Sequence, residues 1–92
     1  MTMSMHTITH QLAASTWTQG PSDIVNSRPE YFWQVIQSEH DGCGRFLVCW
    51  IYGNPDTAFV IDRHGVPQWE QDILDAAAGI AKLWEAEQTC HD

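Results

Sequence analysis

Positive charge is scarce in this sequence, because its 92 residues hold four Lys and Arg against twelve Asp and Glu. The formal charge of -8 argues against direct binding of free nucleic acid, whose phosphates repel an acidic surface, and favours basic partners. Long apolar runs are also lacking, and none approaches the roughly eighteen residues of a membrane span. The first residues have neither the basic nor the apolar region of a signal peptide. We therefore expect a cytoplasmic protein that does not bind membranes.

Cysteine is sparse as well. Cys43, Cys49 and Cys90 are odd in number and include no Cys-x-x-Cys pair, which is typical of a reducing compartment and not of a disulfide framework. His40 and Cys43 have a His-x-x-Cys spacing that could form half of a zinc site with Cys49, or with Cys90 and the adjacent His91. Because no second ligand pair accompanies it, we predict no metal site.

Signatures of catalysis are missing too. The sequence has no Gly-x-Ser-x-Gly, no phosphate-binding glycine loop and no His-Glu-x-x-His. The one nucleophile with a nearby base is Cys43, three residues after His40, and nothing in the sequence supplies a third group to orient the base. We therefore predict a protein that is not an enzyme and that needs no cofactor.

The apolar content is that of a folded protein. Hydrophobic residues make up 43% of the chain and include five Trp, three Phe and two Tyr. A chain of this length has room for one hydrophobic core. We expect a single domain over residues 1–92, with a poorly defined segment at 1–8 and a frayed end at 88–92.

The N-terminal segment is open to two interpretations. Thr9 can cap a short helix through residues 11–14, whereas residues 16–18 suit a strand equally well. The segment 21–29 is expected to be a connection, because Pro29 disfavours the helical conformation at Arg28.

Three strands are predicted in the middle of the chain. Residues 31–38, 45–52 and 57–62 are rich in β-branched and aromatic side chains, and the segments between them contain Gly, Asn, Asp and Pro. Short connections of this kind join antiparallel neighbours, so we predict a three-stranded antiparallel meander.

The register of these strands decides which side chains share a face. Pairing Ser38 with Arg45 places Trp33 opposite Trp50, and pairing Tyr52 with Thr57 extends the same face onto the third strand. The resulting aromatic face contains Tyr31, Trp33, Val35, Val48, Trp50, Tyr52, Phe59 and Ile61. A slip of one residue in this register would exchange the two faces. We expect a helix to pack on the aromatic face.

A long helix is predicted over residues 68–87, with Pro67 at its first turn and acidic residues near its N-terminus. Its broad apolar face holds Trp69, Ile73, Ala76, Ala77, Ile80, Leu83 and Trp84. Gln71, Asp75, Lys82 and Glu85 lie on the opposite side. The fold class is therefore α+β, in the order α-β-β-β-α, with Trp84 as a core anchor.

Acidic residues are spread along the chain between Asp23 and Glu85, without a signature motif. In size, charge and style of fold the sequence resembles the small acidic anti-CRISPR proteins of phages, particularly inhibitors of type I CRISPR-Cas surveillance complexes. The resemblance implies a monomeric inhibitor in the infected bacterial host cell. Such an inhibitor docks on basic Cas protein subunits, next to the guide RNA, and blocks binding of the target nucleic acid. The candidate partner-binding residues are Asp23, Arg28, Asp72, Asp75 and Glu85.

A different class of function stays open. The chain could be a small bacterial accessory or antitoxin-like subunit that dimerises, or covers a partner, through an apolar sheet face. The aromatic residues of the strands would then form the contact, since Trp and Tyr dominate protein interfaces.

Overall fold

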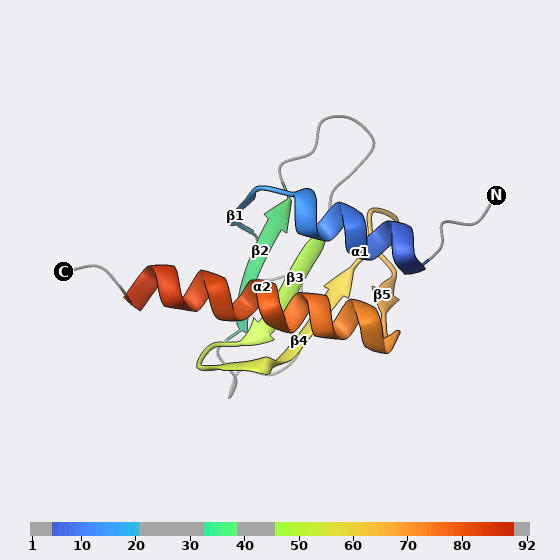
Figure 1. The fold of residues 1–92 in the computed structure, drawn as a ribbon. Coiled ribbons are helices and arrows are strands. Elements are labelled where there is room, and N and C mark those ends of the chain that lie inside the picture. The colour runs from blue at the N-terminus through green and yellow to red at the C-terminus, as the bar shows by residue number, and fades with distance from the viewer. Residues whose placement is uncertain (1–4, 21–32, 39–45, 90–92) are drawn as a thin grey trace.

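Both helices lie on one face of an antiparallel sheet in a computed structural model of the chain (Figure 1). The structure describes residues 5–20, 33–38 and 46–89. In chain order the elements are α1 (Met5–Ala14), β1 (Trp17–Gln19), β2 (Trp33–Ser38), β3 (Leu47–Ile51), β4 (Asn54–Ile61), β5 (Pro67–Gln68) and α2 (Gln71–Thr89). The predicted α+β class and the long C-terminal helix are confirmed.

The sheet has five strands, whereas the sequence predicted three. Its strands follow one another in the order β1-β2-β3-β4-β5, and all neighbours are antiparallel. The three predicted strands correspond to β2, β3 and β4. Pro67 belongs to the edge strand β5, where a missing N–H is tolerated, and so the prediction that it opens a helix is wrong. Helix α2 begins four residues later, at Gln71.

The N-terminal segment contains both a helix and a strand. The two structures that the sequence offered as alternatives, a helix through residues 11–14 and a strand at residues 16–18, thus occur one after the other. Helix α1 starts at Met5, inside the segment that was expected to be poorly defined. Its last turn is closed by Ser15, whose Oγ donates to the carbonyl of Gln11 at 2.7 Å and whose N–H donates to the carbonyl of Leu12 at 3.2 Å. Two residues then separate the helix from β1.

The predicted register of the central strands is wrong by one residue. Trp33 lies opposite Ile51, Gln34 opposite Trp50 and Ile36 opposite Val48. The next pair of strands is shifted in the same way, with Val48 opposite Val60. Because side chains alternate between the faces of a strand, the two shifts place Val48 and Trp50 on the side of the sheet opposite Trp33 and Phe59, so that the predicted aromatic face is split between the two sides.

The hydrophobic core lies between the helices and the sheet face that the correct register creates. It comprises Ile8, Leu12, Ile36, Phe46, Val48, Trp50, Ala58, Val60, Ile73, Ala77 and Ala81, all of them buried. Helix α2 packs on β4 and β3, and α1 packs beside α2. Neither helix in the described part of the chain is long and apolar enough to cross a membrane.

Candidate functional site

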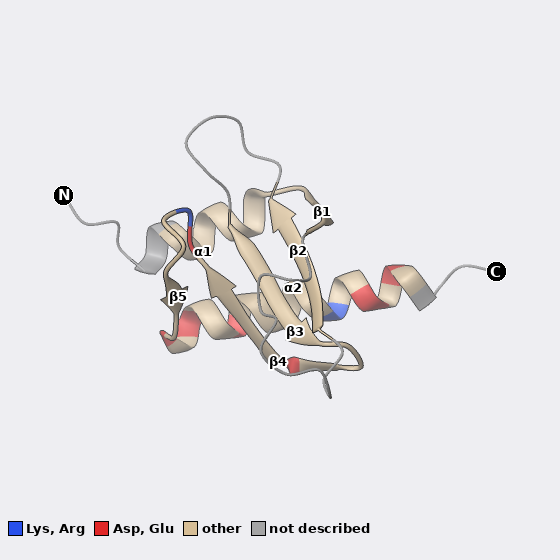
Figure 2. Ribbon diagram, turned by 180° about the vertical axis from the view of Figure 1, so that it is seen from behind, with Lys and Arg blue, Asp and Glu red and all other residues tan. Residues whose placement is uncertain are grey.

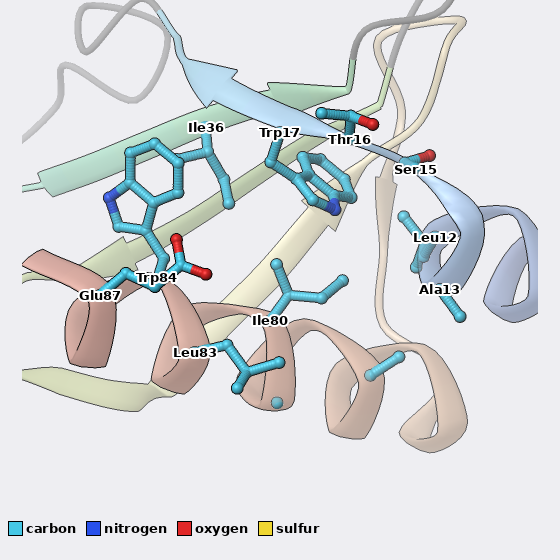
Figure 3. A pocket seen from close by; sticks show the side chains of 12 residues that line it. Leu12, Ala13, Ser15, Thr16, Trp17, Ile36, Ile80, Leu83, Trp84 and Glu87 are labelled. Atoms are coloured by element: carbon cyan, nitrogen blue, oxygen red, sulfur yellow. The ribbon is translucent and has the colours of Figure 1, made fainter.

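An apolar groove opens between β1 and α2 on the helix-covered side of the sheet (Figure 3). It has a volume of about 640 Å³ and is lined by Leu12, Ala13, Ser15, Thr16, Trp17, Ile36, Ala76, Gly79, Ile80, Leu83, Trp84 and Glu87. The groove exists because α1 ends at Ala14 while α2 packs on β4 and β3, so the helical layer is incomplete beside β1 and β2.

Two indole rings form the walls of the groove. Figure 3 shows Trp17 of β1 and Trp84 of α2 on either side of Ile36, which is fully buried. Both Trp side chains are half-buried and pack against the core. Trp84 was predicted to be a core anchor, and it is instead a boundary residue with one side on the core and the other on the groove.

Helix α2 is apolar on more of its surface than the sheet covers. Ile73, Ala77 and Ala81 face the sheet and are fully buried. A second stripe of residues three and four positions apart faces the groove, and it consists of Ala76, Gly79, Ile80, Leu83, Trp84 and Glu87. Leu83 is 68% exposed, which is unusual for a large apolar side chain on the broad face of an amphipathic helix. The predicted apolar face of α2 therefore divides into a core stripe and a groove stripe.

Gly79 offers a test of this open space. Among the described residues, a Cβ atom built at Gly79 meets nothing within 4 Å beyond the neighbouring backbone of α2 itself. Gly79→Ala is expected to raise the free energy of unfolding by about 0.5–1 kcal/mol, because alanine has the higher helix propensity. Urea denaturation of the two proteins measures the difference. A loss of stability in the variant would show that another part of the chain fills the groove at this position.

Acidic residues lie near both ends of α2, and one group of them lies around its first turn (Figure 2). Glu70, Asp72 and Asp75 are all exposed, and we call these three residues the acidic surface. Asp72 lies in the first turn of α2, where negative charge complements the helix dipole. Asp75 accepts a hydrogen bond from Nε2 of Gln71 at 2.8 Å. Asp72 and Asp75 thus lie on the surface, as the sequence predicted.

The two cations of the described residues are engaged elsewhere in the fold. Nη2 of Arg63 donates to Oε1 of Gln11 at 2.8 Å, and the guanidinium lies 5.2 Å from the centroid of the Phe46 ring. Nζ of Lys82 lies 3.4 Å from Oδ1 of Asp56 in an exposed ion pair. Neither Arg63 nor Lys82 is paired with the acidic surface.

Glu85 departs from the prediction that it lies on the exposed side of α2. Its side chain is half-buried, and Oε2 accepts a hydrogen bond from Nε1 of Trp50 at 2.6 Å and another from the N–H of Gly53 at 2.8 Å. Gly53 has a positive φ of 87° and belongs to the turn between β3 and β4. The Glu85 carboxylate therefore joins α2 to this turn, and its charge is used inside the fold. Asp23 and Arg28 lie outside the described residues.

A second apolar surface lies on the sheet face away from the helices. The rings of Trp33 and Phe59 meet edge to face at 6.1 Å, and Phe59 and Trp69 stack at 5.3 Å. Trp69 is 66% exposed. The predicted aromatic face is thus divided, because Trp50 is in the core and Tyr52 is exposed, while Tyr31 lies outside the described residues.

Cys49 lacks the properties of a nucleophile or a metal ligand. It is fully buried on the same sheet face as Phe59, and burial raises the pKa of its thiol from 9.0 to about 12. Within residues 5–20, 33–38 and 46–89 no three His, Cys, Asp or Glu side chains are grouped as metal ligands would be. His40, Cys43, Cys90 and His91 lie outside the described residues.

We expect Cys49 to resist alkylation in the folded protein. The raised pKa keeps the thiol protonated at pH 8, and the thiolate is the reactive form. Iodoacetamide labelling of the Cys43→Ser/Cys90→Ser variant, followed by mass spectrometry, reports on Cys49 alone. Labelling should proceed only in denaturant. Rapid labelling of the folded variant would contradict the burial of this thiol.

Comparison with known proteins identifies no relative, since the chain matches no protein-family model, no curated protein and no solved structure. Along α2 the structure provides an acidic surface that neither Arg63 nor Lys82 neutralises, followed by an apolar groove that extends from Ala76 to Glu87.

Proposed function

We propose that this protein is a non-catalytic inhibitor of the anti-CRISPR type, which docks on basic Cas protein subunits of a type I surveillance complex. The observation that carries the proposal is the acidic surface of Glu70, Asp72 and Asp75, whose charge no described Lys or Arg balances. Surfaces that hold guide RNA or target DNA are rich in Lys and Arg, and an acidic protein is electrostatically complementary to them.

The mechanism is competition for a basic surface. Exposed acidic side chains steer the inhibitor toward Lys and Arg residues before contact, which accelerates association. The bound inhibitor then occupies the surface that the target nucleic acid needs. Asp23 and Arg28 remain candidates for the same contact, with Arg28 beside the guide RNA. Glu85 leaves the set of candidates, because its carboxylate accepts hydrogen bonds from Trp50 and Gly53.

A gel-shift assay tests this function. Purified type I surveillance complexes of several subtypes are incubated with the protein, and binding of a labelled target duplex is measured at about 150 mM salt. We expect an equimolar amount of the protein to abolish target binding by at least one complex. The protein alone should leave the duplex unshifted. Undiminished target binding by every complex, or a shift of the duplex by the protein alone, would contradict the proposal.

The exposure of Trp69 favours a second candidate function. Its stacked pair with Phe59, next to Trp33, is an apolar contact surface on the face away from the helices. A small accessory or antitoxin-like subunit would use this surface to dimerise or to cover its partner. A molecular mass that rises with concentration in sedimentation, and returns to that of the monomer in Trp69→Ser, would favour this function over the inhibitor.

A further inference from the structure

We propose that the groove between β1 and α2 receives an amphipathic helix of the partner protein, with Lys or Arg on the flank of that helix. The apolar side chains of the helix would lie between Trp17 and Trp84, and its cation beside Glu87. This inference rests on the proposed function in one respect, namely that the partner is a basic protein.

The groove has the composition of a binding site. Its volume of about 640 Å³ lies within the range of roughly 300–1,000 Å³ that is usual for ligand pockets. Its floor includes Ile36, which is fully buried in the core, and its walls are two half-buried indole rings. Trp is the residue type most enriched at the energetic centres of protein interfaces.

The shape of α2 favours a helix as the occupant. The groove stripe follows the i, i+3, i+4, i+7 spacing along one side of α2, which is the spacing through which one helix packs along another. Ala76 and Gly79 are small, and no residue of another described element lies within 4 Å of a Cβ built at Gly79, so a neighbouring backbone can approach closely. The occupant would complete the helical layer that α1 leaves open beyond Ala14.

Charge selects a basic partner over a second copy of this chain. Glu87 is the one charged side chain among the described residues that line the groove, and it is exposed. The chain as a whole carries a formal charge of -8, so a second copy would bring like charge to the same site. A helix that combines apolar residues with Lys or Arg can pack between the two Trp side chains and also pair with Glu87.

A synthetic peptide provides the probe. It is an amphipathic helix of about sixteen residues, with Leu at i, i+3, i+4 and i+7 spacing and Lys elsewhere, labelled for fluorescence anisotropy. We expect micromolar binding to the unaltered protein. Leu83→Gln should weaken binding at least about tenfold, since it removes an exposed apolar contact. Gly79→Leu should weaken it similarly by filling the groove, while the stability of the folded variant is maintained or raised.

Val66→Gln is the matched control. Val66 is also an exposed apolar residue, 51% accessible, and it lies in the β4–β5 connection outside the groove. Peptide affinity should be unchanged in this variant.

Equal affinity for Leu83→Gln and Val66→Gln, or no binding of the peptide at about 1 mM, would overturn the inference. Equally tight binding of a peptide with Glu in place of Lys would overturn the basic character of the partner. Self-association that Leu83→Gln abolishes would identify a second copy as the occupant instead.

The peptide assay and the gel-shift assay separate the two proposals. If the peptide fails to bind while the protein still blocks target binding, the helix-receiving groove is wrong and the inhibitor function stands. If the peptide binds as expected while every surveillance complex still binds its target, the inhibitor function is wrong and the groove stands.

Discussion

Trp50→Ala is expected to lower the free energy of unfolding by about 3–5 kcal/mol, the largest effect of any single substitution in the described chain. Trp50 is the largest fully buried side chain, and it lies in the middle strand β3 with its indole N–H bonded to Glu85. Truncation would remove the ring, leave a cavity under α2 and abolish that hydrogen bond. A domain of this size has a total stability of only about 5–15 kcal/mol, so partial unfolding at 37 °C is expected. Urea denaturation followed by circular dichroism provides the measurement.

Trp69→Ala serves as the control for Trp50→Ala. Trp69 is the same residue type, but it is 66% exposed and its one described aromatic contact is the stacking on Phe59. Its truncation should cost about 1 kcal/mol or less. Similar losses of unfolding free energy in the two variants would contradict the burial of Trp50 and the strand register that places it in the core.

Glu85→Ala is expected to cost about 1.5–3 kcal/mol, which is the usual range for hydrogen bonds to a charged group. The substitution leaves the buried N–H of the Trp50 indole without an acceptor and releases α2 from the β3–β4 turn. Glu85→Gln keeps a carbonyl oxygen in the same place and should lose less. Both losses are measured as shifts in the midpoint of urea denaturation.

Glu87→Ala is the control for Glu85→Ala, because it also removes a carboxylate from α2 but breaks no hydrogen bond to Trp50. Glu87 lies two residues further along α2 and is exposed. Its removal should leave stability within about 0.5 kcal/mol of the unaltered protein. If Glu85→Ala were as mild as Glu87→Ala, the hydrogen bond to Trp50 would contribute little, and Glu85 would again be available to a partner.

The elements that the sequence predicted correctly are those with a long or repeated pattern. Helix α2 shows apolar residues at helical spacing over five turns, and the central strands are separated by Gly-containing turns. The prediction of the register was wrong because both faces of these strands are apolar. When Val35 and Ile36 are both fully buried, alternation does not show which of them faces the helices.

The edge strand β5 was missed for a different reason. Strand β5 has two residues, and Pro67 is as common at a helix start as at a sheet edge. A turn through Asp62 decides between them, since its carboxylate accepts hydrogen bonds from the N–H groups of His64 and Val66 and from Nε2 of Gln68. That network holds Pro67 and Gln68 against β4. It depends on contacts that no local propensity expresses.

The two surfaces differ in how far the sequence could reveal them. Asp72 and Asp75 are visible from composition and helical position alone. The groove depends on where α1 ends relative to β1 and α2, which is a tertiary property. Glu85 looks like any exposed helical acid until the β3–β4 turn brings Gly53 and Trp50 to it. A helical wheel of α2 does not contain that information.

The proposed contact joins the acidic surface to a basic protein. Its most direct test is the association rate constant for a surveillance complex that the protein inhibits, measured by stopped flow from about 50 to 300 mM salt. We predict that the rate falls as salt rises, and that Asp72→Lys/Asp75→Lys slows association at least about tenfold at low salt while dissociation changes little. Asp56→Lys is the control, because it changes the net charge by the same amount as Asp75→Lys. Asp56 lies on β4 in an exposed ion pair with Lys82, away from the acidic surface, so only Asp75→Lys should slow association appreciably. Association rates that are independent of salt and equal in all of these variants would contradict the account.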